Sequence, residues 1–186
     1  MRRFVLWFVT VIALGIGAAR ADEIELLRAA VEPTEESYVL DADFAFELNP
    51  RLEDALASGV PLWFVVEFQA ERWRWYWLNE RIADRRLPLR LSFHTLTRQY
   101  RVSSGALYQN YPTLPEAVRA LSRIRDWPVL DRGQLKPDET YEASLRMRLD
   151  VAQLPKPFQV TALTNRDWTL ASEWKRWKLR AVGGER

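Results

Sequence analysis

The sequence predicts a mainly β protein, an immunoglobulin-like antiparallel β-sandwich with two short helices; a partly closed β-barrel is the alternative. Apolar and polar residues alternate over long stretches, turn residues separate about seven such stretches, and only two segments have helical spacing. Residues 61–78 form the most apolar stretch and hold four of the nine tryptophans. Because no other stretch has as much apolar surface to bury, we expect the fold to be organised around it.

The N-terminal residues have the pattern of a secretory signal peptide. Arg2 and Arg3 precede an apolar run over residues 4–19, and Ala19-Arg20-Ala21 supplies a small-x-small cleavage site. The run is shorter than the roughly 20 residues that span a bilayer, which favours cleavage over a retained anchor. We therefore expect a signal peptide over 1–21, one sandwich domain over 22–180 and a frayed tail over 181–186.

Composition excludes several classes of function. The chain has no cysteine, which rules out disulfides, thiol catalysis, cysteine-ligated metals and a lipid anchor. Removing the three arginines of the signal peptide changes the formal net charge from +2 to −1. The basic character of the full chain is therefore poor support for a nucleic-acid partner.

The first half of the mature chain predicts strands at 24–31 and 37–48, the second with strict alternation from Tyr38 to Leu48. A short helix follows, in which Asn49 is the N-cap and Gly59 ends the last turn. Residues 61–78 and 86–102 then form a hairpin joined by a polar connection. The buried face changes from even to odd residue numbers inside the first of these strands. A bulge at 70–72 would explain that change, and a turn there is the alternative.

The second half begins with a turn at 103–105 and an extended piece at 106–111. A capping box from Thr113 to Glu116 then starts a helix whose apolar spacing continues to Ile124. The remaining elements are an exit segment at 126–130, a turn at 131–133, a strand at 140–151, a rigid link at 154–157 that leads into 158–163, and a last strand at 168–179.

Four phrases resemble one known family: W-Y-W-L-N-E from Trp75, L-S-F-H-T-L-T-R-Q-Y-R-V from Leu91, R-L-D-V-A-Q-L-P-K-P-F-Q from Arg148, and W-T-L-A-S-E-W-K-R-W from Trp168. Together they are similar to a family of exported proteobacterial proteins classed only as a domain of unknown function. The resemblance implies export to the periplasm and a gene neighbourhood shared with a membrane sensor kinase of the nitrogen-regulation type. It supplies no catalytic or binding residues.

Few residues suggest chemistry. His94 is the single histidine and lacks the partners of a metal site or a catalytic triad. No glycine-rich phosphate loop or nucleophile elbow is present. The pair Asp41 and Asp43 is interpreted as solvated strand residues rather than as a cation site. The carboxylates Glu67, Glu71, Glu80 and Asp84 could serve a glycoside hydrolase only with a cleft and a controlled separation. We therefore expect no enzyme, no metal and no cofactor.

One cluster stands out as a candidate binding site, and it comprises Arg72, Trp73, Arg74, Trp75, Tyr76 and Trp77. Trp, Tyr and Arg are enriched at interface hot spots. The alternative, which we favour, is a core strand with arginines extending over its edge. The sequence therefore predicts a periplasmic, non-catalytic adaptor that contacts an envelope protein such as a sensor kinase. A cell-wall carbohydrate-binding module or glycan hydrolase is the alternative.

Overall fold

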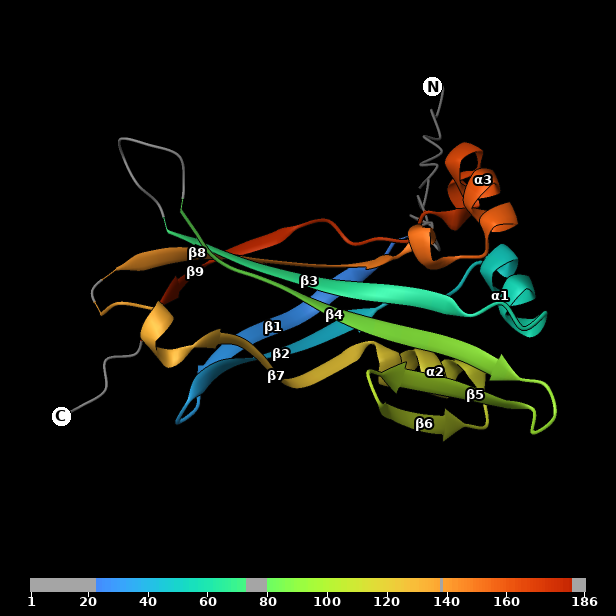
Figure 1. The fold of residues 1–186 in the computed structure, drawn as a ribbon, viewed down its shortest axis with the longest axis horizontal. Coiled ribbons are helices and arrows are strands. Elements are labelled where there is room, and N and C mark those ends of the chain that lie inside the picture. The colour runs from blue at the N-terminus through green and yellow to red at the C-terminus, as the bar shows by residue number, and fades with distance from the viewer. Residues whose placement is uncertain (1–22, 73–79, 138, 182–186) are drawn as a thin grey trace, which may run out of the picture.

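The computed structural model describes residues 23–72, 80–137 and 139–181 (Figure 1). Within them, the strands form two antiparallel sheets, one with the order β1-β2-β7 and one with the order β6-β5-β4-β3-β8-β9. The β-sandwich that the sequence predicts is confirmed, and the barrel alternative is not observed in the described residues. The described chain has three α-helices rather than the expected two.

The small sheet consists of β1 (Glu25–Pro33), β2 (Ser37–Ala45) and β7 (Arg123–Asp131). The large sheet consists of β3 (Leu62–Arg72), β4 (Glu80–His94), β5 (Gln99–Ser104), β6 (Leu107–Tyr111), β8 (Thr140–Leu149) and β9 (Lys175–Arg180). The helices are α1 (Pro50–Ala57), α2 (Leu114–Leu121) and α3 (Lys156–Thr164). Three 3-10 turns are η1 (Arg132–Gln134), η2 (Val151–Gln153) and η3 (Arg166–Trp168). In Figure 1, α1 and α3 lie at the same end of the sandwich, and α2 lies beside β5 and β6.

The core lies between the two sheets. Alternate side chains of β2, β3 and β8 point inward and are buried: Tyr38, Leu40, Ala42 and Phe44; Phe64, Val66, Phe68 and Ala70; Tyr141, Ala143, Leu145, Met147 and Leu149. The faces that the alternation predicts for these three strands are therefore confirmed.

The bulge expected in β3 at residues 70–72 is not present, and the irregularity lies in the neighbouring strand β4 instead. The pairing of β3 with β4 shifts register between Ala70 and Glu71, while β3 itself continues to Arg72, which lies opposite Glu80. The extra residue is Ile82 of β4, because Ala70 pairs with Ala83 and Glu71 pairs with Arg81, and β3 pairs with β8 without a shift up to Arg72. β3 therefore keeps its alternation up to Arg72, which also excludes the alternative of a turn at residues 70–72. Residues 73–79, with the tryptophans that suggested the change of parity, lie outside the described residues.

The expected second strand of this hairpin, residues 86–102, was wrong in two respects. β4 already begins at Glu80, because cross-strand ion pairs between Arg72 and Glu80 and between Arg81 and Glu71 satisfy the charges that suggested a connection. The strand then breaks after His94. The amide and hydroxyl of Thr97 both bond to His94 Nδ1, and Arg98 adopts a φ of 52° to close the turn.

The second half of the chain also differs from expectation. The helix α2 ends at Leu121, and Ile124 therefore lies in β7 rather than in the helix. At the other end of α2, the side chain of Thr113 makes no capping hydrogen bond. Residues 158–163 lie in α3. The last strand begins at Lys175 rather than at Trp168, because Trp168 is buried beneath Phe158 with ring centroids 5.3 Å apart.

A buried carboxylate lies at the centre of the outer face of the large sheet. Glu67 of β3 is 4 % exposed. Arg146 Nε donates to its Oε2 at 2.5 Å, Arg148 donates to both of its oxygens at 3.3 Å, and Arg86 lies 3.7 Å away. Burial alone would raise the pKa of Glu67, but the hydrogen bonds from Arg148 and Arg146 outweigh it and hold the pKa below the ordinary 4.5.

We expect this cluster to make stability depend on pH. Since the folded pKa is depressed, the contribution of Glu67 is complete above about pH 5 and is lost as the pH falls through the folded pKa. The variant Glu67→Gln should therefore lower the free energy of unfolding at pH 7 by about 2 kcal/mol, and the deficit should shrink towards pH 3. Urea unfolding of both proteins across this range measures the effect.

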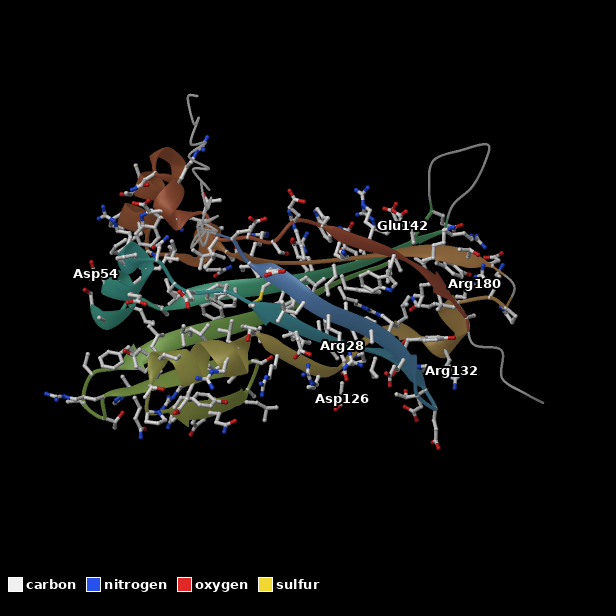
Figure 2. The ribbon with its side chains drawn as sticks, turned by 180° about the vertical axis from the view of Figure 1, so that it is seen from behind. Arg28, Asp54, Asp126, Arg132, Glu142 and Arg180 are labelled. Atoms are coloured by element: carbon white, nitrogen blue, oxygen red, sulfur yellow. The ribbon has the colours of Figure 1, made fainter. Side chains whose placement is uncertain are left out.

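A matched control is Glu142→Gln, which changes an exposed carboxylate on the neighbouring strand β8 (Figure 2). It should cost less than about 0.5 kcal/mol at any of these pH values. A deficit of Glu67→Gln that is equally large at pH 3 and pH 7 would show that the carboxylate's charge is not what stabilises the sheet.

Candidate functional site

Of the six residues that the sequence selects as a binding site, Arg72 lies within the described part of the chain. Its side chain is 15 % exposed, and the guanidinium donates to both oxygens of Glu139 at 2.8 and 3.0 Å and also bonds to Glu80. Arg72, together with Tyr141, lowers the pKa of Glu139, and the Arg72 pKa is raised in turn. Arg72 therefore ties β3 to β4 and to the segment before β8. Trp73, Arg74, Trp75, Tyr76 and Trp77 lie outside the described residues, so their binding role stays a prediction.

The four carboxylates considered for glycoside hydrolysis each have an arginine partner. Glu67 is held by the cluster described above, and Glu80 bonds to Arg72. Arg81 lies 3.6 Å from Glu71 and 3.3 Å from Asp84. The structure thus distributes these acids along the β3–β4 pair as ion pairs that hold the strands in register.

The two aspartates of β2 also have structural partners. Asp41 accepts a hydrogen bond from the backbone N–H of Asp126 at 2.9 Å, where the chain adopts a φ of 49°. Asp43 pairs with Arg125 at 2.5 Å. Across the described residues, no group of three or more His, Asp or Glu side chains is arranged to hold a metal ion.

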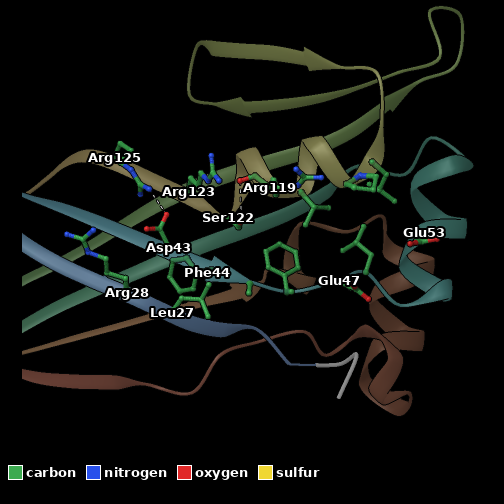
Figure 3. A pocket seen from close by; sticks show the side chains of 16 residues that line it. Leu27, Arg28, Asp43, Phe44, Glu47, Glu53, Arg119, Ser122, Arg123 and Arg125 are labelled. Carbon is green, nitrogen blue, oxygen red and sulfur yellow. Dashed lines mark hydrogen bonds and ion pairs between the residues drawn. The ribbon is translucent and has the colours of Figure 1, made fainter. Parts of the chain in front are cut away.

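A groove lies between the small sheet and α2, and we call it the β2–α2 groove (Figure 3). It has a volume of about 1020 Å³. Its walls come from five segments: β1, the end of β2 with the residues that follow it, α1, α2 and the start of β7. The sixteen lining residues are Leu27, Arg28, Asp43, Phe44, Ala45, Phe46, Glu47, Leu48, Glu53, Leu114, Pro115, Val118, Arg119, Ser122, Arg123 and Arg125.

The floor of the groove is apolar and fixed. The alternation of β2 continues past its end, so that Phe44 and Leu48 are buried below the groove and Phe46 packs on Phe64 at 5.4 Å. Leu114 and Val118 supply the half-buried edge of α2, one helical turn apart. Because these side chains also belong to the core, the floor is formed before any ligand arrives.

One end of the groove is basic. Arg125 is held in place, because it bonds to Asp43 and to the carbonyls of Ala42 and Ile124. Arg28, Arg119 and Arg123 are exposed side chains from three different elements, and among the described residues none of them forms an ion pair. Figure 3 shows Arg28 and Arg123 at the same end as the Asp43–Arg125 pair, and Arg119 further along α2.

The opposite end of the groove is acidic. Glu47 follows β2 and Glu53 lies in the first turn of α1, and Figure 3 shows both at the end beside α1. Asn49 caps this helix by accepting from the N–H of Leu52 at 3.0 Å and donates to the carbonyl of Asp167 at 2.7 Å. The groove is therefore polarised along its length, with an apolar floor between charges of opposite sign. Such a surface can orient an amphipathic ligand that carries acidic groups at one end.

Sequence reasoning missed this groove. It continued the helix to Ile124 and so placed Arg119 and Arg123 in one element, whereas α2 ends at Leu121 and Arg123 lies on β7. A usable signal was present in residues 44–48. Apolar and polar residues keep alternating there after β2 has ended, and no described strand pairs with the residues beyond Ala45.

The comparisons with known proteins place the chain in a family without supplying a function. None of the described helices has the length and apolar character needed to cross a bilayer. No curated protein and no solved structure matches the chain. The model of one family, described as a domain of unknown function, matches residues 21–178 and so covers almost all of the chain. The protein therefore belongs to the DUF4390 family.

Proposed function

We propose that the protein is an exported, non-catalytic binding protein of the periplasm. Its β2–α2 groove holds an acidic, partly apolar segment of another envelope protein. The observation that carries this proposal is the meeting of three exposed arginines, Arg28, Arg119 and Arg123, over an apolar floor. Arginines presented in this way recognise carboxylates, and the half-buried side chains of Phe46, Leu114 and Val118 offer contact to an apolar neighbour.

Export is supported by the N-terminal pattern and by where the described fold begins. Cleavage after Ala21 leaves Ile24, which is buried and whose N–H bonds to the carbonyl of Ala171 at 3.2 Å. It also leaves all of β1, which starts at Glu25. The sandwich therefore loses no described element when residues 1–21 are removed.

The shape of the groove favours a protein segment over a small metabolite. Its volume lies at the upper end of the range for small-molecule pockets, about 300–1000 Å³, and its charges are separated along its length. A segment with acidic residues at one end and basic residues at the other complements both ends. The extracytoplasmic part of a sensor kinase of the nitrogen-regulation type is the first partner to test, as the family resemblance suggests.

A second candidate function, binding of an acidic cell-wall glycan, is favoured by the outer face of the large sheet. The Arg90 guanidinium lies 5.5 Å from the ring centroid of Trp63, and that of Arg146 lies 4.5 Å from the ring centroid of Trp174. Both tryptophans are half-buried and flank the Glu67 cluster. Aromatic faces beside guanidinium groups suit sugar rings that carry carboxylates.

The export proposal predicts a mature N-terminus at Asp22. Mass spectrometry of the protein purified from the cell envelope should find a chain shorter by residues 1–21. Recovery of the full-length chain in the membrane fraction would instead indicate a retained anchor and would remove the soluble periplasmic adaptor from consideration.

The groove proposal is tested with a fluorescein-labelled peptide that alternates Asp or Glu with Leu or Phe. The acidic peptide should bind the wild-type protein, and the double variant Arg119→Glu, Arg123→Glu should weaken binding at least about tenfold, because two attractive charges become repulsive. Fluorescence anisotropy measures Kd, and added salt should weaken binding to the wild-type protein.

The matched control is the double variant Arg166→Glu, Arg176→Glu, which reverses two exposed charges on η3 and β9 and should leave Kd unchanged. A version of the peptide with Lys in place of the acids should bind poorly. Equal affinity for both peptides, or no loss with Arg119→Glu, Arg123→Glu, would contradict the groove as an acidic-segment site.

The glycan proposal is tested by tryptophan fluorescence during titration with soluble peptidoglycan fragments. A saturable shift that is lost in Trp174→Leu and kept in the groove variant Arg119→Glu, Arg123→Glu would place the glycan on the outer face. Absence of any shift would rule out this second function.

A further inference from the structure

The strand β6 is an edge of the large sheet. In the described chain it pairs with β5 on one side, and its other side faces no strand. No backbone hydrogen bond joins β6 to a described element other than β5. A row of unpaired N–H and C=O groups at a sheet edge is a template for pairing with another strand.

The other three edges of the described sheets are protected against such pairing. The edge strand β7 contains Pro128 and a shift of register, and β1 contains a bulge between Leu26 and Arg28. The edge strand β9 carries four basic residues, which are Lys175, Arg176, Lys178 and Arg180. These are the usual devices that prevent edge-to-edge association. The sequence of β6, L-Y-Q-N-Y, has neither a charge nor a proline.

The exposed side chains of β6 are also unusually apolar. Leu107 is 79 % exposed and Tyr108 is 64 % exposed. The strand is supported on both faces. The helix α2 packs over β5 and β6 on one face, and on the other face the side chain of Arg101 contacts two residues of β6. The Arg101 guanidinium lies 4.5 Å from the ring centroid of Tyr108, and its Nε donates to Asn110 at 2.9 Å. A preformed edge binds a partner strand without a further ordering cost.

We propose that β6 pairs with β6 of a second copy of this chain, antiparallel, about a two-fold axis at Gln109. This register uses all five residues of the strand. It places Gln109 opposite itself, Leu107 of one copy opposite Tyr111 of the other, and Tyr108 opposite Asn110. The two large sheets become one continuous sheet.

The sequence of β6 is the reason to assign a second copy as the occupant. In this register, the apolar Leu107 is covered by an aromatic ring, the polar amide side chains face one another or a tyrosine, and no like charges meet. A shift by one residue would place fewer residues in the ladder. The pairing is isologous, so it closes as a dimer and does not propagate into a fibre. With only five residues in each strand, we expect a reversible dimer with Kd in the micromolar range.

Charge variants at the two-fold axis test the register directly. Sedimentation velocity of the mature protein from about 1 to 200 µM should show a monomer–dimer equilibrium. Gln109→Lys and Gln109→Glu should each be monomeric across the same range, because each places two like charges opposite one another. An equimolar mixture of the two variants should recover the dimer, because Lys then lies opposite Glu.

Gln153→Lys and Gln153→Glu are matched controls on the exposed η2 turn and should dimerise as the wild type does. Because Gln109 is exposed, its variants should keep the urea midpoint of the wild-type chain in its monomeric range. The proposal is overturned by a wild-type protein that stays monomeric to 200 µM, by single variants that still dimerise, or by a mixture that fails to reassociate.

Discussion

The packing of β3 against β2 is the interaction on which the rest of the structure depends. Every second side chain of β3 between Leu62 and Ala70 is buried, and the facing side chains of β2 are buried as well. Because the chain contains no cysteine, no disulfide adds to its stability, and this contact and the similar one made by β8 supply it through burial. The helices and the 3-10 turns are arranged around a sandwich that is already closed.

Burial of the inner face leaves charge on the outer faces, and the structure arranges that charge in two ways. Along β3 and its neighbours, arginines pair with carboxylates: Glu67, Glu71 and Glu80 each have a partner on an adjacent strand. These pairs hold the strands in register. Around the β2–α2 groove, in contrast, Arg28, Arg119 and Arg123 point to solvent with no ion-pair partner among the described residues. Free guanidinium groups over an apolar floor are better suited to a ligand than to stability.

The groove exists because two elements end early. β2 ends at Ala45, so the apolar residues after it have no neighbouring strand among the described residues. The helix α2 ends at Leu121, so Arg119 is separated from the arginines of β7. The space between them is bounded by residues far apart in the chain, from Leu27 to Arg125. A ligand in this groove would therefore contact both α1 and α2, the helices in two of the connections between the sheets. The groove is a suitable place for recognition, because a ligand there leaves the core undisturbed.

The sequence by itself determined the class of fold, the inner faces of β2, β3 and β8, and the cap of α1 at Asn49. Each of these follows from local alternation or from a single turn of backbone. It did not determine the break between β4 and β5, the helix α3 or the early end of α2. The helix α3 and the end of α2 depend on contacts between residues separated in the chain, such as Phe158 with Trp168 and Ile124 with Ala42, whereas the break after His94 depends on the bonds that Thr97 makes to its ring. The groove and the contrast between β6 and the other edges were decided by the tertiary structure alone. Which arginine is paired, and which edge has a neighbour, depends on the strand order, and the pattern of residues along the chain does not contain that order.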